Sequence, residues 1–145
     1  MKLLSAFLFT FMFASPATWK TDFAEAKTEA STKHELILLN FSGSDWCLPC
    51  MKLKKTIFEN ESFTTYAAEN LVLVNADFPR QAKHKLSADQ KKINEELAEK
   101  YNPEGKFPYT VLITSDGKIV KQWDGLHDVS PDQFVDEIKQ VDVAR

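Results

Sequence analysis

Two short apolar runs limit the fold of this chain more than any other feature of its sequence. The runs are ELILLNF, residues 35–41, and LVLVNADF, residues 71–78. Their hydrophobic residues are consecutive rather than alternating, which is typical of strands that are covered on both faces. Because both faces of such a strand have to be covered, the runs predict a sheet with helices on each side.

The remaining segments predict helices and one hairpin. We expect helices at residues 19–34, at about 47–59, at 61–70, after a capping box at Ser87–Gln90, and after Ser130–Pro131. Asp116–Gly117 divides YTVLITSDGKIVKQWDG into two strands, since glycine supplies the positive φ of a tight turn. A helical crossover makes the two apolar strands parallel, and the hairpin adds antiparallel strands. The predicted fold class is α/β, with a mixed central β-sheet and helices on both faces.

The first 17 residues differ in composition from the rest of the chain. Lys2 precedes the apolar run LLSAFLFTFMFA, and small residues follow at Ser15 and Ala17. This pattern predicts a secretory signal peptide, residues 1–17, followed by one domain, residues 18–145. An uncleaved anchor is less favoured, because a membrane span needs about 20 apolar residues. The last residues, VDVAR, contain no ER-retention signal, so we expect export to a bacterial periplasm or a similar extracytoplasmic space.

The composition argues against two classes of function. A net charge of −3 and a pI near 5.6 give no sign of a basic surface for nucleic acid. With only four glycines, the chain has no glycine-rich loop for a phosphate group. We therefore expect no nucleic-acid partner and no nucleotide cofactor.

Both cysteines lie in the heptapeptide SDWCLPC, at Cys47 and Cys50, and three interpretations are open. A structural disulfide across so short a loop would remove little entropy from the unfolded chain. A zinc site needs about four ligands, and only the well-separated His34, His84 and His127 are available besides the thiols. A redox-active pair is favoured, because a strand–C-x-x-C–helix order is typical of thiol–disulfide exchange proteins.

The redox interpretation gives the two thiols different roles. Cys47 follows a strand and opens a helix, where backbone N–H groups and the helix dipole stabilise a thiolate. Cys50 lies one turn later, on the same helix face as Leu53 and Ile57. We therefore predict that Cys47 attacks a substrate disulfide and that the sheltered Cys50 resolves the intermediate.

The sequence also resembles the thioredoxin-like family. WCLPC is similar to the W-C-x-P-C motif of thioredoxins and of exported thioredoxin-like reductases, and KFPYTVLI is similar to the segment that carries their cis-proline. NFSGSDWC, IFENESF and VNADFPR resemble the exported branch that includes the periplasmic domain of the transmembrane thiol reductant. The resemblance extends from about Trp19 to Val141 and implies a thioredoxin fold.

The resemblance also implies a function and further site residues. It implies a protein-disulfide reductase without cofactor or metal, acting on disulfide-containing proteins and receiving electrons from a membrane thiol donor. It implies a cis peptide bond between Phe107 and Pro108, which leaves the Phe107 backbone free to bind an extended substrate. Trp46 would form an apolar wall beside Cys47. We expect a monomer.

Two points stay open at this stage. Many thioredoxins use a buried aspartate to deprotonate the second cysteine, whereas Asn40, which does not titrate, lies near that place here. Asp45 is the nearby alternative for a proton relay, or it is a solvated loop residue. An oxidase or isomerase of the same fold, or a non-catalytic binding or chaperone module, are the other functions that the sequence allows.

Overall fold

A computed structural model of the chain describes residues 16–143. Of the predicted signal peptide, residues 1–17, all but the last two residues lie outside this range. No helix within residues 16–143 is long and apolar enough to cross a bilayer.

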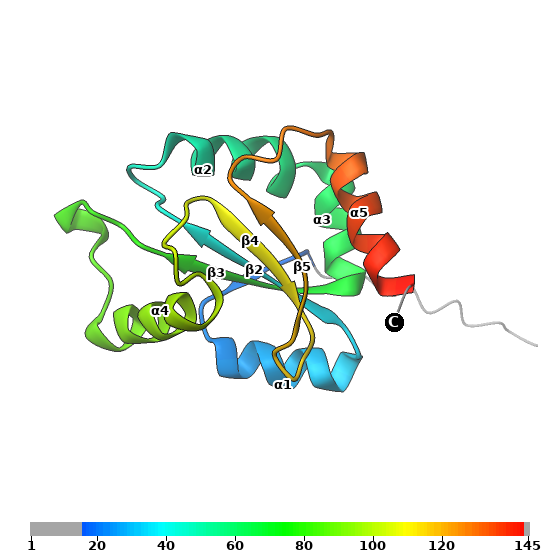
Figure 1. Cartoon of the computed structure of the whole chain (residues 1–145), viewed down its shortest axis with the longest axis horizontal. Helices are drawn as coiled ribbons and strands as arrows, with labels where there is room; N and C mark the ends of the chain where they lie inside the picture. The colour runs from blue at the N-terminus through cyan, green and yellow to red at the C-terminus, as the bar shows by residue number, and fades with distance from the viewer. Residues whose placement is uncertain (1–15, 144–145) are drawn as a thin grey trace, which may run out of the picture.

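The described residues form a five-stranded sheet between two layers of helices (Figure 1). The elements are β1 (Trp19–Lys20), α1 (Phe23–Lys33), β2 (Leu36–Ser42), α2 (Leu48–Leu53), the π-helical turn η1 (Lys54–Phe58), α3 (Glu61–Asn70), β3 (Leu71–Asp77), the 3₁₀ turn η2 (Ala82–His84), α4 (Ala88–Tyr101), β4 (Tyr109–Ile113), β5 (Ile119–Asp124) and α5 (Pro131–Val143). The strand order is β1-β3-β2-β4-β5. β1, β3 and β2 run parallel, and β4 and β5 are antiparallel. The predicted mixed sheet is therefore confirmed.

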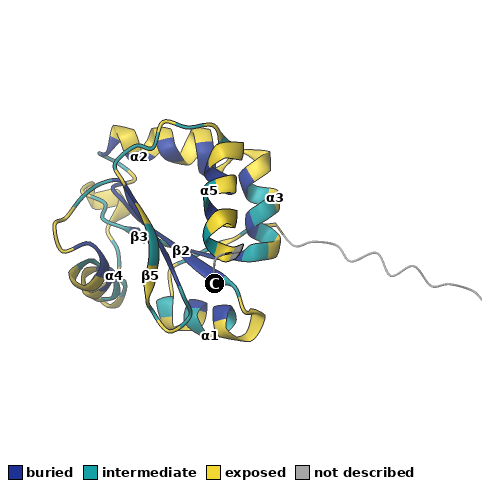
Figure 2. Ribbon diagram, turned by 45° about the vertical axis from the view of Figure 1, so that its right-hand side comes forward, coloured by how far each residue is buried: buried dark blue, intermediate teal, exposed yellow. Residues whose placement is uncertain are grey.

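The two helix layers explain why the strand sequences are apolar without alternation. Leu36 and Leu38 point to the layer that contains α2, α3 and α5, whereas Ile37 and Leu39 point to the layer of α1 and α4. Successive side chains of a strand face opposite sides of the sheet, so the consecutive positions Leu36–Leu39 are all apolar where both sides are covered. Figure 2 shows the result, with buried central strands inside and exposed residues on the outer faces of the helices.

The N-terminal segment differs from its prediction as a helix. Trp19 and Lys20 form β1, which pairs with Leu73 and Val74 of β3. The helix begins only after Asp22, whose side chain accepts a hydrogen bond from the backbone N–H of Glu25 at 2.9 Å. A strand of two residues is too short to show a hydrophobic periodicity, so β1 could be recognised only from its pairing with β3.

Three helix and turn signals can be compared with the structure. Gly117 has φ of +92°, as the hairpin turn required. Ser130 and Gln133 cap α5 reciprocally, with Pro131 as its first residue. The predicted capping box of α4 is only half formed: Ser87 accepts from the Gln90 N–H, but the Gln90 side chain donates to Thr21 and Asn94 instead.

Candidate functional site

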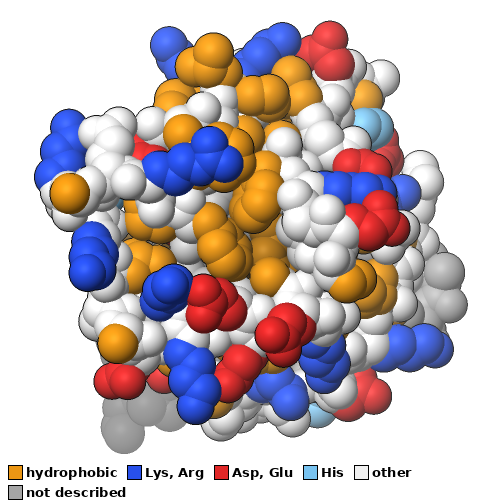
Figure 3. Space-filling view, turned by 60° about the vertical axis from the view of Figure 1, so that its left-hand side comes forward, with side chains coloured by type: hydrophobic (Ala, Val, Ile, Leu, Met, Phe, Trp, Pro, Cys, Tyr) orange, Lys and Arg blue, Asp and Glu red, His pale blue; other side chains and the backbone are white. Residues whose placement is uncertain are grey.

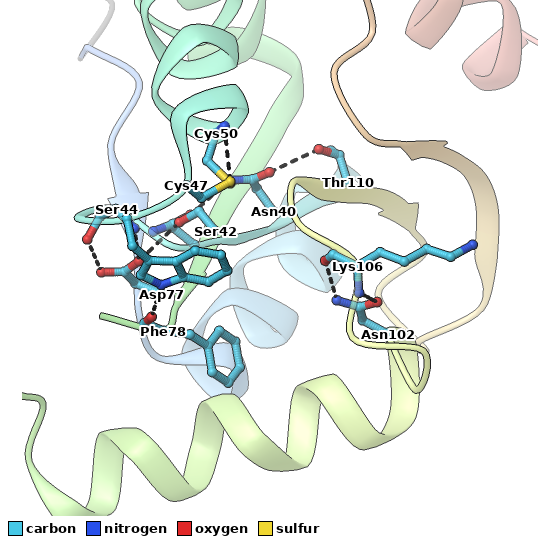
Figure 4. Close-up of a disulfide and its surroundings, with 12 residues drawn as sticks. Asn40, Ser42, Ser44, Cys47, Cys50, Asp77, Phe78, Asn102, Lys106 and Thr110 are labelled. Atoms are coloured by element: carbon cyan, nitrogen blue, oxygen red, sulfur yellow. Dashed lines mark hydrogen bonds between the residues drawn. A yellow bond between two sulfur atoms is a disulfide. The ribbon is translucent and has the colours of Figure 1, made fainter. Parts of the chain in front are cut away.

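The two cysteines form a disulfide at the start of α2 (Figure 4). Cys47 is the N-cap residue of the helix, and the backbone N–H of Cys50 donates to its Sγ at 3.3 Å. The predicted position at a helix N-terminus is thus confirmed. Both residues are buried, with 4% and 5% of their surface exposed, so Cys50 is sheltered but Cys47 is equally so in this oxidised state. Pro49 adds no unsatisfied N–H in this first turn.

Trp46 lies beside the disulfide and is fixed by four neighbours. Its indole N–H donates to the backbone oxygen of Phe78 at 2.7 Å. Its ring meets the Phe107 ring edge-on, with centroids 5.4 Å apart, and the Arg80 guanidinium lies 3.6 Å from its centroid. The indole also packs against Gly43, where a Cβ would overlap the ring. The indole is therefore held in one orientation next to Cys47.

We expect Gly43→Ala to displace this indole and to cost about 1–3 kcal/mol of unfolding free energy, as overpacking of a tight site does. The measurement is urea unfolding of the variant, in the wild-type background and in a Trp46→Leu background. The smaller leucine relieves the overlap, so the cost should shrink there. An equal cost in both backgrounds would show that Trp46 is not the source of the penalty.

The peptide bond between Phe107 and Pro108 is cis, as the resemblance implied. The preceding loop is clamped by the buried side chain of Asn102, which donates to the Lys106 backbone oxygen at 2.8 Å and accepts from the Lys106 N–H at 2.9 Å (Figure 4). The Pro108 oxygen accepts from the Gly125 N–H at 2.9 Å. Because Tyr109 pairs with Phe41 near the end of β2, this loop lies at the same end of the sheet as the cysteines.

A chain of polar side chains lies under the disulfide (Figure 4). It consists of hydrogen bonds from Thr110 to Asn40 at 3.0 Å, from Asn40 to Asn75 at 3.0 Å, and from Ser42 to Asn75 and Asp77 at 3.2 Å each. Asp77 in turn accepts from the backbone N–H and hydroxyl of Ser44, in the loop before the motif. The members nearest the sheet centre are amides and hydroxyls, which do not titrate.

A cavity of about 460 Å³ opens beside Cys50. Asn40, Ser42 and Asn75 form part of its lining, and the rest includes Trp19, Glu59 and residues of α2 and η1. Cys50 is therefore buried, but it borders a cavity that is lined in part by polar side chains and has room for water.

Asp45 does not join this polar chain but anchors the loop after β3. Its carboxylate, 3% exposed, accepts from the backbone N–H groups of Arg80 and Gln81 at 2.9 Å each and lies 3.0 Å from His84 Nδ1. The hydrogen bond from Arg80, with those from Gln81 and His84, lowers the pKa of Asp45 to about 2. Asp45 is therefore not a solvated loop residue: its carboxylate anchors the loop, and both of its oxygens already accept hydrogen bonds.

This pKa gives a stability prediction. A carboxyl whose pKa is lowered on folding stabilises the fold above its unfolded pKa, and that contribution is lost as the pH falls toward the folded value. We expect the melting temperature to lose this contribution between about pH 4 and pH 2 in the wild type. Asp45→Asn should be less stable at neutral pH and flatter across that window. If the melting temperatures of the two proteins changed in parallel with pH, Asp45 would not stabilise the fold in this way.

A model of the thioredoxin-like domain matches residues 23–142. The chain belongs to the thioredoxin-like family. Its similarity to Disulfide bond reductase DsbH of Chlamydia pneumoniae is 35% identity over 105 residues, which cover 72% of this chain and 61% of that relative. The chain thus spans less than two thirds of that relative's length.

Solved structures agree with the thioredoxin-like fold. A DsbH oxidoreductase matches with a TM-score of 0.81 and 28% identity, covering 100% of this chain and 95% of the other. The oxidised C-terminal domain of Neisseria meningitidis DsbD matches with a TM-score of 0.53 and 19% identity over 81% of this chain and 90% of that domain. At this identity the second likeness concerns the fold alone.

Sequence reasoning did not assign roles to several residues of this thioredoxin-like site. Asn75, Asp77 and Ser42 join Asn40 because register pairs 40 with 75 and 42 with 77. A signal was present: polar residues two apart in otherwise apolar strands share one face of a sheet. Asn102, which clamps the loop before Pro108, lies at the end of α4, where the sequence contains no comparable pattern.

Proposed function

We propose that this chain is a thiol–disulfide oxidoreductase that reduces protein disulfides through Cys47 and Cys50. The observation that carries the proposal is the disulfide at the N-cap of α2, with the Cys50 N–H donating to Cys47 Sγ. In the reduced protein the same N–H stabilises a Cys47 thiolate, which is the reactive species in disulfide exchange. The likeness to a relative named as a disulfide bond reductase supports the direction.

The reaction proceeds in two exchanges. The Cys47 thiolate attacks one sulfur of a substrate disulfide, forming a mixed disulfide, and the other substrate sulfur leaves as a thiolate that takes a proton from water. Cys50 then loses its proton, and its thiolate attacks Cys47 Sγ, which releases the second substrate sulfur. Two electrons pass to the substrate, and the enzyme keeps the Cys47–Cys50 disulfide until a dithiol donor reduces it.

The remaining site residues bind the substrate and help Cys50 to lose its proton. We assign Trp46 to the apolar wall and the Phe107 backbone before Pro108 to an added-strand contact with an extended substrate. The polar cavity next to Cys50 offers a path for its proton to water past Asn40 and Ser42. A relay role for Asp45 stays a prediction, and its engaged oxygens and low pKa make it the weaker base.

The proposed cellular setting follows the sequence prediction. We propose that residues 1–17 direct export, that residues 18–145 act as a monomeric domain in an extracytoplasmic space such as the periplasm, and that a membrane thiol protein supplies the electrons. The likeness to proteins named DsbH and DsbJ supports such partners.

Turnover of insulin disulfides with a dithiol donor tests the enzyme assignment. We expect catalysis well above the donor alone. A non-catalytic binding module of the same fold needs neither thiol and would leave the rate at that background, which would overturn the proposal.

A further inference from the structure

The charges around the disulfide are distributed unlike those of the whole chain. Residues 48–58 and 78–86, two of the segments beside the site, contain six lysines and arginines and no aspartate or glutamate, and Glu59 directly follows the first of them. The rest of the chain therefore holds 12 of the 18 basic residues and all 21 acidic residues. An acidic protein thus has a basic surface at its redox pair. We call this surface the basic face; its six charged members are Lys52, Lys54, Lys55, Arg80, Lys83 and Lys85.

Most of these charges are not neutralised within the described residues. Four of them, Lys55, Arg80, Lys83 and Lys85, are exposed and have no carboxylate within ion-pair distance in residues 16–143. Lys52 and Lys54 have only long pairs, 3.8 Å to Asp128 and 3.7 Å to Glu59. Exposed pairs of this length contribute little, so the face keeps its positive potential.

The basic face is held in place relative to the disulfide. Asp45, two residues before Cys47, anchors the backbone of Arg80 and Gln81. The Arg80 guanidinium is stacked on Trp46 at 3.6 Å, which places a fixed cation beside the residue that precedes Cys47. A preorganised arginine loses less conformational entropy when it meets a carboxylate than a free surface lysine does.

Exposed apolar side chains belong to the same face. Leu48, between the cysteines, is 75% exposed, and Met51, directly after Cys50, is 37% exposed. Figure 3 shows hydrophobic side chains gathered in the middle of this side of the molecule, with lysine and arginine side chains beside them and aspartate and glutamate side chains farther round the same rim. An apolar centre with a charged rim is the usual anatomy of a protein-binding surface.

We propose that the basic face selects acidic polypeptide segments, so that the preferred partners carry aspartate or glutamate beside the disulfide that is exchanged. This inference rests on the proposed function and names its partner class. Opposite charge on the partner raises the rate of productive encounter by about 10–10³-fold, and salt removes that gain.

Three cyclic disulfide peptides test the proposal, with the same core and flanks of three glutamates, three glutamines or three lysines. The measurement is the second-order rate constant for their reduction by the reduced protein, at about 0.01 M and about 1 M salt, where charges act over roughly 30 Å and 3 Å. At low salt we expect the glutamate peptide to react at least about tenfold faster than the lysine peptide. At high salt the two rates should agree within about twofold.

Charge reversal then locates the effect. Lys83→Glu with Lys85→Glu should remove the preference for the glutamate peptide while leaving the glutamine peptide's rate unchanged. The matched control, Lys27→Glu with Lys118→Glu, changes the net charge equally but lies on α1 and the β4–β5 turn, and should keep the preference. An equal loss of the preference in both variants, or equal rates for all three peptides in the wild type, would contradict the role of the basic face without contradicting the proposed reductase activity. No reduction of any peptide would overturn the proposed function itself.

Discussion

Replacing Cys47 with serine should lower the reduction of insulin disulfides to the rate of the dithiol donor alone, a loss of about 10³-fold or more. The reason is that the serine hydroxyl is not ionised near pH 7, whereas the thiolate at the α2 N-cap is stabilised by the Cys50 N–H. The fold should survive, because the Cys47–Cys50 link closes only a short loop and contributes little stability. Circular dichroism of the variant checks that it is folded.

Cys50→Ser is the matched variant and should behave differently. Cys47 can still attack, but nothing resolves the mixed disulfide, so a covalent enzyme–substrate adduct should accumulate. Mass spectrometry under non-reducing conditions detects the adduct, and its mass should disappear on reduction. An adduct that forms instead with Cys47→Ser would reverse the assigned roles of the two thiols.

Phe134→Ala should produce the largest loss of stability among single changes outside the site. Phe134 of α5 is 1% exposed and lies in ring contact with Trp123 at 4.8 Å and with Phe58 and Phe63 at 6.0 Å each. Removing a ring from such a cluster costs about 3–5 kcal/mol, through lost transfer energy and the cavity left behind. This is a large part of the roughly 5–15 kcal/mol that holds a typical domain folded.

Urea unfolding measures this loss, with Gln140→Ala as the control on the exposed face of the same helix. The control should change the unfolding free energy by less than about 0.5 kcal/mol. A loss below about 1 kcal/mol for Phe134→Ala would contradict the packing of α5 against η1 and α3.

The parts of the fold that were predicted from sequence are those with a local cause. The continuous apolar runs indicated β2 and β3 because both helix layers cover them, and Gly117 marked the hairpin because its φ is positive. β1 was missed for the opposite reason. Trp19 and Lys20 are extended only because Leu73 and Val74, more than fifty residues away, offer them hydrogen-bonding partners.

The candidate site divides in the same way. The cysteine pair and Pro108 stand in short motifs and were found from them. The polar chain from Asn40 to Asp77 depends on the register of β2 against β3, and the anchor made by Asp45 depends on a loop that folds back over thirty residues later. The spacing of the polar residues shows that those of one strand share a face, but it does not show which residue of another segment each one contacts, so the contacts themselves were visible only in the folded chain.

The measurement that tests the central claim most directly is the reduction potential of the Cys47–Cys50 pair, obtained by equilibration in thiol–disulfide buffers. A protein-disulfide reductase has to give up electrons, so we expect a value close to that of thioredoxin, about −270 mV. A value near −120 mV, roughly that of a strong thiol oxidase, would contradict the proposed direction, because such a disulfide takes electrons from its substrates.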